Sequence, residues 1–98
     1  MTQEIQQLLS SFESIKQTGE WYEYWSARDL QKVLWYTEWR NFHSVIQKAV
    51  ISCEEAWNIK DEHFVKTNKP LTWGQWAIQE VLDFELSRYA CYLILQAE

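Results

Sequence analysis

The stretch Ser26-Ala27-Arg28-Asp29-Leu30 decides how the middle of this chain folds, because it has the spacing of a helix start. The Ser26 hydroxyl can accept a hydrogen bond from a first-turn amide, and Asp29 stands where the end of a helix is positive. We therefore expect a helix that begins directly after Ser26 and ends near Trp35. Thr37 is expected to cap a second helix shortly afterwards.

The second helix is predicted from apolar residues three and four positions apart, which form one continuous stripe on a helix surface. This stripe consists of Phe42, Val45, Ile46, Ala49, Val50, Cys53 and Trp57. Two helices joined by a turn of two or three residues resemble a helix-turn-helix corner. Short helix pairs of this kind also occur in many folds that have no role on DNA.

On the N-terminal side of this pair, the sequence predicts one more helix and a strand. Ile5, Leu8, Leu9 and Phe12 recur at helical spacing with Gln and Ser between them, so residues 3–14 are expected to form an amphipathic helix. A turn is expected at residues 16–19. The aromatic-rich residues 20–25 then suit a strand.

On the C-terminal side, residues 58–76 are polar and irregular, and we expect a mobile loop there with at most a short strand at residues 63–65. Residues 80–86 alternate between apolar and polar side chains, as in a half-buried strand. Ser87 is expected to cap a last helix that runs through Leu95.

This order of elements predicts an α+β fold that is mainly helical, with a small sheet formed by two or three short strands. We expect a single domain over residues 1–98. Within it, residues 1–15 form the N-terminal amphipathic helix and residues 20–98 form the core.

Composition restricts the possible functions. The chain has 98 residues and a net charge of −5, which opposes a broad phosphate-binding surface, so any contact with DNA must be local. Aromatic residues make up 16%, and we expect them in the core more often than on a base-stacking surface. No apolar run approaches the length of a membrane span, and Cys53 and Cys91 are expected to be buried thiols of a cytoplasmic protein.

Local spacing reveals no catalytic, metal or cofactor site. His43 and His63 lack the spacing of zinc ligands with the two cysteines, and no nucleophile has a base beside it. Gly19 and Gly74 are the only glycines, which excludes a glycine-rich nucleotide loop. We therefore expect neither enzymatic activity nor a cofactor.

Basic residues at helix starts are the candidate contacts to DNA or to a partner, since free amides there already favour phosphate. The alternative is that these cations pair with Asp29, Glu38 or Glu85 and fix the helix starts. The candidates from helices and from the expected loop are Arg28, Lys32, Arg40, Asn41, Lys66, Lys69 and Arg88.

Three blocks, Glu23 to Leu30, Trp39 to Phe42 and Ser87 to Ile94, together resemble the N-terminal region of the bacterial DNA-damage-inducible protein D family. That region is similar to BRO family N-terminal domains. The resemblance implies an α+β fold, a DNA-binding or regulatory role without enzymatic activity, and an association with the SOS response and with restraint of the recombinase filament. Trp35 stands where the family has Gly, so the turn between the paired helices is expected to be longer or strained.

Two hypotheses follow. In the first, the chain is a regulatory module of DNA-damage or mobile-element biology that contacts DNA or a recombinase–DNA filament through the basic candidates. In the second, it is a protein-interaction or homo-oligomerisation module that uses the N-terminal helix and never binds DNA.

Overall fold

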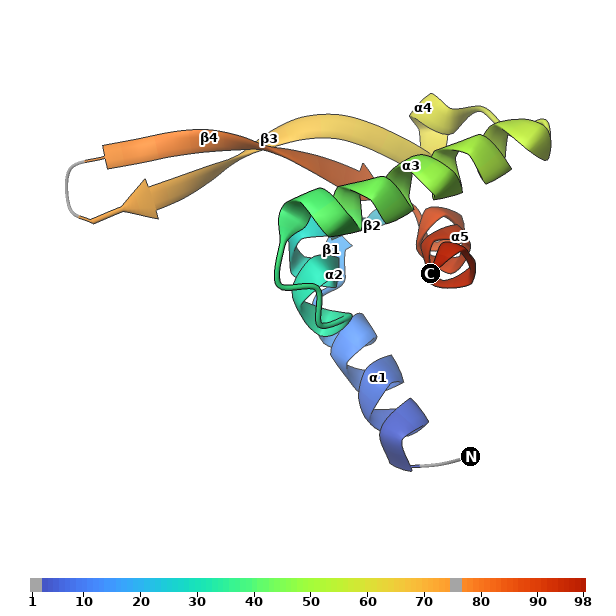
Figure 1. The fold of residues 1–98 in the computed structure, drawn as a ribbon, viewed down its shortest axis with the longest axis horizontal. Coiled ribbons are helices and arrows are strands. Elements are labelled where there is room, and N and C mark those ends of the chain that lie inside the picture. Colours follow the sequence, from blue (N-terminus) through green and yellow to red (C-terminus); the bar gives the residue numbers. More distant parts are fainter. Residues whose placement is uncertain (1–2, 75–76) are drawn as a thin grey trace.

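The computed structural model describes residues 3–74 and 77–98. Within these ranges the elements are α1 (Gln3–Ser14), β1 (Gln17–Thr18), β2 (Glu23–Ser26), α2 (Ala27–Val33), α3 (Trp39–Glu55), α4 (Lys60–His63), β3 (Phe64–Trp73), β4 (Ala77–Leu86) and α5 (Arg88–Ala97). The architecture is α+β. The long β3–β4 hairpin projects from one side of the helices, and α1 extends in a different direction (Figure 1).

The prediction of a small sheet with two or three short strands is wrong. Four strands form one sheet in the order β1-β2-β4-β3, and every neighbouring pair is antiparallel. β3 and β4 have ten residues each and pair from Phe64 and Leu86 at the base to Trp73 and Ala77 near the tip. Residues 17–18, within the expected turn, form β1 instead.

The expected loop at residues 58–76 is also wrong for most of its length, because it contains α4 and β3; residues 75 and 76 lie outside the described residues. β3 is an edge strand, since only β4 flanks it, and much of it faces solvent. Its sequence is therefore polar and lacks the clear alternation by which a half-buried strand is recognised. An edge strand also tolerates Pro70, which has no N–H to donate.

α3 lies at the centre of the core, as its apolar stripe predicts. It packs against α5, and in both helices the contact side consists of fully buried side chains. These side chains are Phe42, Ile46, Ala49, Cys53, Ala90, Cys91 and Ile94. In the described part of the chain, no helix has the length and apolar character needed to cross a membrane.

Two of the three predicted helix caps are confirmed. The Ser26 hydroxyl accepts a hydrogen bond from the Asp29 amide, and the Ser87 hydroxyl accepts one from the Ala90 amide at 3.0 Å. Thr37 is not a cap: α3 starts two residues later, and its N-cap is Glu38, which makes no side-chain capping bond. The turn between the paired helices runs from Leu34 to Glu38 and is longer than the two or three residues of a helix-turn-helix corner, in line with the longer turn expected at Trp35.

Trp35 and Trp57 occupy the same unusual backbone position. Both have φ in the left-handed region, 66° and 65°, directly after the C-cap residues Leu34 of α2 and Ala56 of α3. Their amides and those of Tyr36 and Asn58 bond back to helix carbonyls in the Schellman pattern, in which this position is usually glycine. The expected strain at Trp35 is therefore confirmed. The two indoles are 89% and 94% exposed, so they are exceptions to the expectation that aromatic residues lie mainly in the core.

Candidate nucleic-acid interface

The outer surface of α3 carries polar side chains on the side away from its buried stripe. We call the exposed residues Arg40, Asn41, Ser44, Gln47 and Lys48 the α3 polar face. From residue 39 to residue 53 the helix contains no Asp or Glu. Although the chain has a net charge of −5, this face combines cations with amide groups and has no carboxylate on the same stretch of helix.

Glu38, one residue before α3, forms an ion pair with Arg40 of this face. Its Oε2 lies 3.2 Å from Nη2 of Arg40, and the two side chains are 57% and 85% exposed. An exposed pair of this kind contributes about 0–1 kcal/mol, so a phosphate can replace the carboxylate at small cost. Arg40 thus shows the pairing that the alternative hypothesis expected, but in a weak form.

Lys66 extends the cationic region from α3 to the hairpin. A groove at this place is lined by residues of α3, α4 and the hairpin, and it includes one carboxylate, that of Asp61. The other lining residues are His43, Gln47, Val50, Lys60, Phe64, Lys66, Leu82 and Phe84. The His43 ring stacks on Phe84 with 6.1 Å between ring centroids. Side chains of α3 and of β3 therefore face one common groove, with Lys66 exposed at its edge.

Arg28 faces inward and is a structural residue. Its Nε donates to the Leu82 carbonyl at 2.9 Å, and its guanidinium lies 3.8 Å from the centroid of the Trp39 ring. Burial lowers its pKa, although Asp83 acts in the opposite direction. Arg28 thereby joins the start of α3 to β4 and does not extend toward solvent as a DNA contact.

Asp83 and Lys69 complete the attachment of the hairpin to α2. The Asp83 carboxylate is 3% exposed and accepts hydrogen bonds from the Ser26 hydroxyl at 2.6 Å, the Arg28 amide at 3.0 Å and the Phe84 amide at 2.8 Å. Lys69 forms an ion pair of 2.9 Å with Asp29. The cation of Lys69 therefore holds the hairpin to the start of α2.

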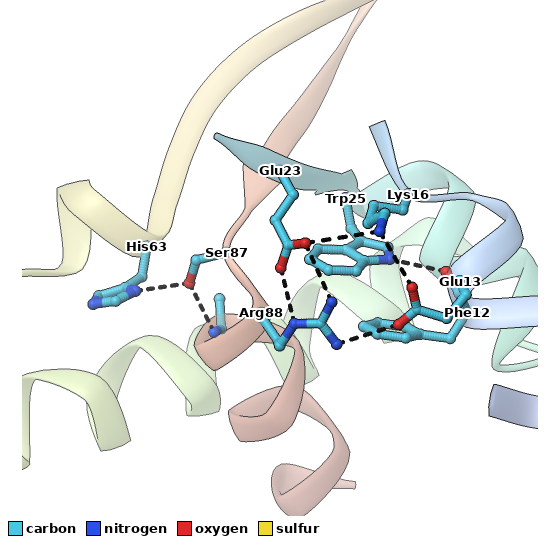
Figure 2. A network of polar contacts seen from close by, with 9 residues as sticks. Phe12, Glu13, Lys16, Glu23, Trp25, His63, Ser87 and Arg88 are labelled. Carbon is cyan, nitrogen blue, oxygen red and sulfur yellow. Dashed lines mark hydrogen bonds and ion pairs between the residues drawn. The ribbon is translucent and has the colours of Figure 1, made fainter. Parts of the chain in front are cut away.

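Arg88 holds α1 and β2 together, as Figure 2 shows. It donates to both carboxylate oxygens of Glu23, at 2.8 and 3.2 Å, and to Glu13 at 3.2 Å. These hydrogen bonds, first of all those with Glu23, raise the pKa of Arg88, and its bond lowers the pKa of Glu23. The expected pairing with Glu85 is wrong, and Arg88 is occupied within the fold.

The aromatic rings beside Arg88 complete this attachment of α1. The Trp25 ring stacks on Phe12 with 4.5 Å between centroids and donates from Nε1 to the Phe12 carbonyl at 2.9 Å. The Arg88 guanidinium lies 5.0 Å from the Trp25 ring. The last turn of α1 is thus fixed to the core.

The predicted site residues therefore divide into groups. Arg28, Lys69 and Arg88 make contacts inside the fold, while exposed Lys32 lines a groove with Trp35 and α1. Arg40 and Asn41 share the α3 polar face, and Lys66 lies at the edge of the adjoining groove.

Ser44, Gln47 and Lys48 were missed by the sequence analysis. Two features of the sequence identify them. No Asp or Glu occurs from residue 39 to residue 53, and these three residues lie at helix positions that the apolar stripe does not occupy.

The buried thiols have the environment of structural residues. Burial raises the pKa of Cys91 to about 12 and also raises that of Cys53, so neither is a thiolate at neutral pH. Within residues 3–74 and 77–98, no group of three or more His, Cys, Asp or Glu side chains could hold a metal ion. His63 contacts the Ser87 hydroxyl at 2.7 Å, where Ser87 caps α5.

Comparison with known proteins identifies a relative. No family model and no solved structure matches the chain. The chain is 42% identical over 74 residues to the DNA damage-inducible protein D of Escherichia coli K12. The match covers 76% of this chain, which spans about a quarter, 27%, of that relative's length. The resemblance predicted from the three sequence blocks is confirmed, and this chain is related to the DNA damage-inducible protein D family.

Proposed function

We propose that this chain is a non-enzymatic regulatory module of the DNA-damage response that contacts DNA through the α3 polar face. The observation that carries the proposal is the absence of carboxylates from residue 39 to residue 53 on a helix whose outer side presents Arg40, Asn41, Gln47 and Lys48. The relationship to a protein named as DNA damage-inducible supports the biological setting.

The electrostatics favour a small contact area. Because the whole chain carries −5, the field at a distance repels DNA, and only close contacts at α3 and Lys66 attract phosphate. The exposed amide and hydroxyl groups of Asn41, Gln47 and Ser44 add uncharged hydrogen-bonding capacity. A nucleoprotein filament formed by a recombinase contains DNA as well, and binding to such a filament is the narrower form of this proposal.

The proposal is tested with the double variant Arg40→Glu, Lys48→Glu. Both side chains are exposed, so the variant is expected to fold. We expect fluorescence anisotropy with labelled DNA to show that the wild type binds. This binding should weaken between about 50 and 200 mM salt, because it releases counterions from the DNA and that release is less favourable at higher salt. The double variant should bind at least about tenfold more weakly, a loss of about 1.4 kcal/mol. Equal affinity of wild type and variant would contradict the proposal.

A second candidate function is supported by an apolar groove between α1, α2 and α5. Leu8, Leu9, Val33, Leu34 and Leu95 line it, and Leu8, Leu9 and Leu95 are partly exposed. Exposed apolar surface of this kind is typical of protein–protein contacts. If two copies associate through this groove, light scattering of the wild type should give the mass of a dimer. The mass of a monomer would contradict self-association through the groove.

A further inference from the structure

The side chains of the α3 polar face are suited to hydrogen bonds with the edges of DNA bases and not to stacking on the faces of bases. Arg and Lys donate to guanine in the major groove, and Asn and Gln can both donate to and accept from adenine there. Arg40, Lys48, Asn41 and Gln47 provide these groups on one exposed side of a single helix. α3 has 17 residues and is about 26 Å long, which suffices to lie in a major groove.

α3 is also the second helix of the α2–α3 pair, in which the longer turn from Leu34 to Glu38 separates the two helices. In helix-turn-helix proteins the second helix lies in the major groove and its N-terminal residues contact the base edges. Arg40, Asn41 and Ser44 lie in the first turns of α3, and its N-terminal end is fixed by the Arg28 contacts to Trp39 and Leu82. The end of the helix that would read bases is therefore rigidly supported.

The hairpin adds a second surface beside α3. Lys66 pairs with Phe84 across the β3–β4 ladder, so the two side chains share a face, and Phe84 stacks on His43 of α3. Asn68 follows on the same face, opposite Leu82. In Figure 1 the hairpin continues past the N-terminal end of α3. A duplex bound along α3 would therefore bring one of its backbones toward Lys66.

The same surface lacks what single-stranded DNA requires. Single-strand binding uses exposed aromatic rings on which bases stack. Among the described residues of α3 and of the adjoining hairpin face, Phe42, Phe64 and Phe84 are buried and Trp39 is covered on one face by Arg28. The exposed Trp35 lines the separate groove with Gln7 and Leu8, and Trp57 follows the acidic residues that end α3.

We infer that the ligand of the α3 polar face is double-stranded DNA, with α3 in the major groove and Lys66 on a phosphate of the adjoining backbone. This inference rests on the proposed function and narrows it to one form of DNA.

The test compares one labelled random-sequence 24-bp duplex with its separated single strands, using the full chain at about 50 mM salt. We expect the duplex to bind at least about tenfold more tightly than either strand. Methyl green, which occupies the major groove, should displace the protein, whereas distamycin, which occupies the minor groove, should not.

Two variants locate the contact. Gln47→Glu adds a negative charge to the α3 polar face and should weaken duplex binding, while Gln6→Glu adds the same charge on exposed α1 and should leave it unchanged. Lys66→Ala should reduce the slope of log affinity against log salt by about one, as expected for one lost phosphate contact.

The outcomes separate the two levels of the argument. Equal or tighter binding of single strands, displacement by distamycin alone, or equal effects of the two glutamate variants would overturn the duplex inference and leave DNA binding intact. Absence of binding to every probe would contradict the proposed function itself.

Discussion

Two regions of this molecule carry cations on or beside a helix, yet the cations serve different purposes. Where the hairpin meets α2, Arg28 bonds to the Leu82 carbonyl and stacks on Trp39, while Lys69 pairs with Asp29. On the α3 polar face, Arg40 has only an exposed partner in Glu38, and Lys48 makes no ion pair within the described residues. The hydrogen-bonding capacity of the first region is used within the fold, and that of the second is free for a ligand.

This difference shows that position in the sequence does not decide the role of a helix-start cation. Arg28 and Arg40 both lie in the first turn of a helix and both have an acidic neighbour in sequence. What distinguishes them is the long-range neighbour: the Leu82 carbonyl of β4 accepts a hydrogen bond from Arg28, whereas the Arg40 side chain is 85% exposed. Variants should therefore separate the two regions, with stability changing in one and DNA affinity in the other.

The largest effect on stability is expected from Asp83→Ala, where the hairpin meets α2. The substitution removes the acceptor of three hydrogen bonds and leaves buried or half-buried donors on Ser26, Arg28 and Phe84 without a partner. We expect a loss of about 3 kcal/mol in the free energy of unfolding, measured by urea titration.

Glu85→Ala is the matched control for Asp83→Ala. Glu85 lies two positions further along β4, is only half-buried, and makes no ion pair or side-chain hydrogen bond among the described residues. Its substitution should change stability by about 0.5 kcal/mol or less. If the two variants were equally stable, the buried carboxylate would not be the attachment point that distinguishes this region.

The sequence was informative where local chemistry decides the structure. The Ser26 and Ser87 caps, the stripe of α3 from Phe42 to Cys53 and the strain at Trp35 each depend on neighbours within a few residues, and these are confirmed. Trp57, the expected last member of the stripe, lies beyond α3 and is exposed. Structure that depends on distant pairing was missed. β3 exists because β4 binds it along ten residues, and its own sequence lacks a strand period.

The candidate site divides in the same way. The exposed position of Arg40 and Asn41 follows from the helical period of α3, so these residues could be placed on an outer face from the sequence alone. The Arg88–Glu23 contact joins residues 65 positions apart, and no local pattern indicates it. For the same reason the sequence could not separate a structural cation from an available one.

A smaller effect, of opposite sign, is expected from Trp35→Gly. A residue with a side chain in the left-handed region is strained, and the exposed indole gains little from packing. After the greater entropy of glycine in the unfolded chain is subtracted, we expect a gain of up to about 1 kcal/mol, or a rise in Tm of about 4 °C.

Trp57→Gly and Trp21→Gly test whether backbone strain causes this gain. Trp57 has the same backbone conformation and 94% exposure, so its substitution should also stabilise the protein. Trp21 is 90% exposed, but it is not among the described residues with positive φ, so its substitution should give no gain. Stabilisation by all three variants would mean that loss of an exposed indole, and not relief of strain, is responsible.

The smallest effect is expected from the pH dependence of the Arg88–Glu23 contact. The hydrogen bond from Arg88 lowers the pKa of Glu23 below its ordinary value of 4.5. Folding therefore favours the ionised carboxylate, so its contribution to stability is present above pH 4.5 and is lost as pH falls through the lower pKa of the folded state. Wild type should exceed Glu23→Gln in urea midpoint at neutral pH, and the difference should shrink in acid.

Glu20→Gln, at an exposed glutamate without an ion pair in the described residues, should show no such convergence. A constant difference between wild type and Glu23→Gln at all pH values would show that Arg88 stabilises the fold by packing on Trp25 and not through its charge.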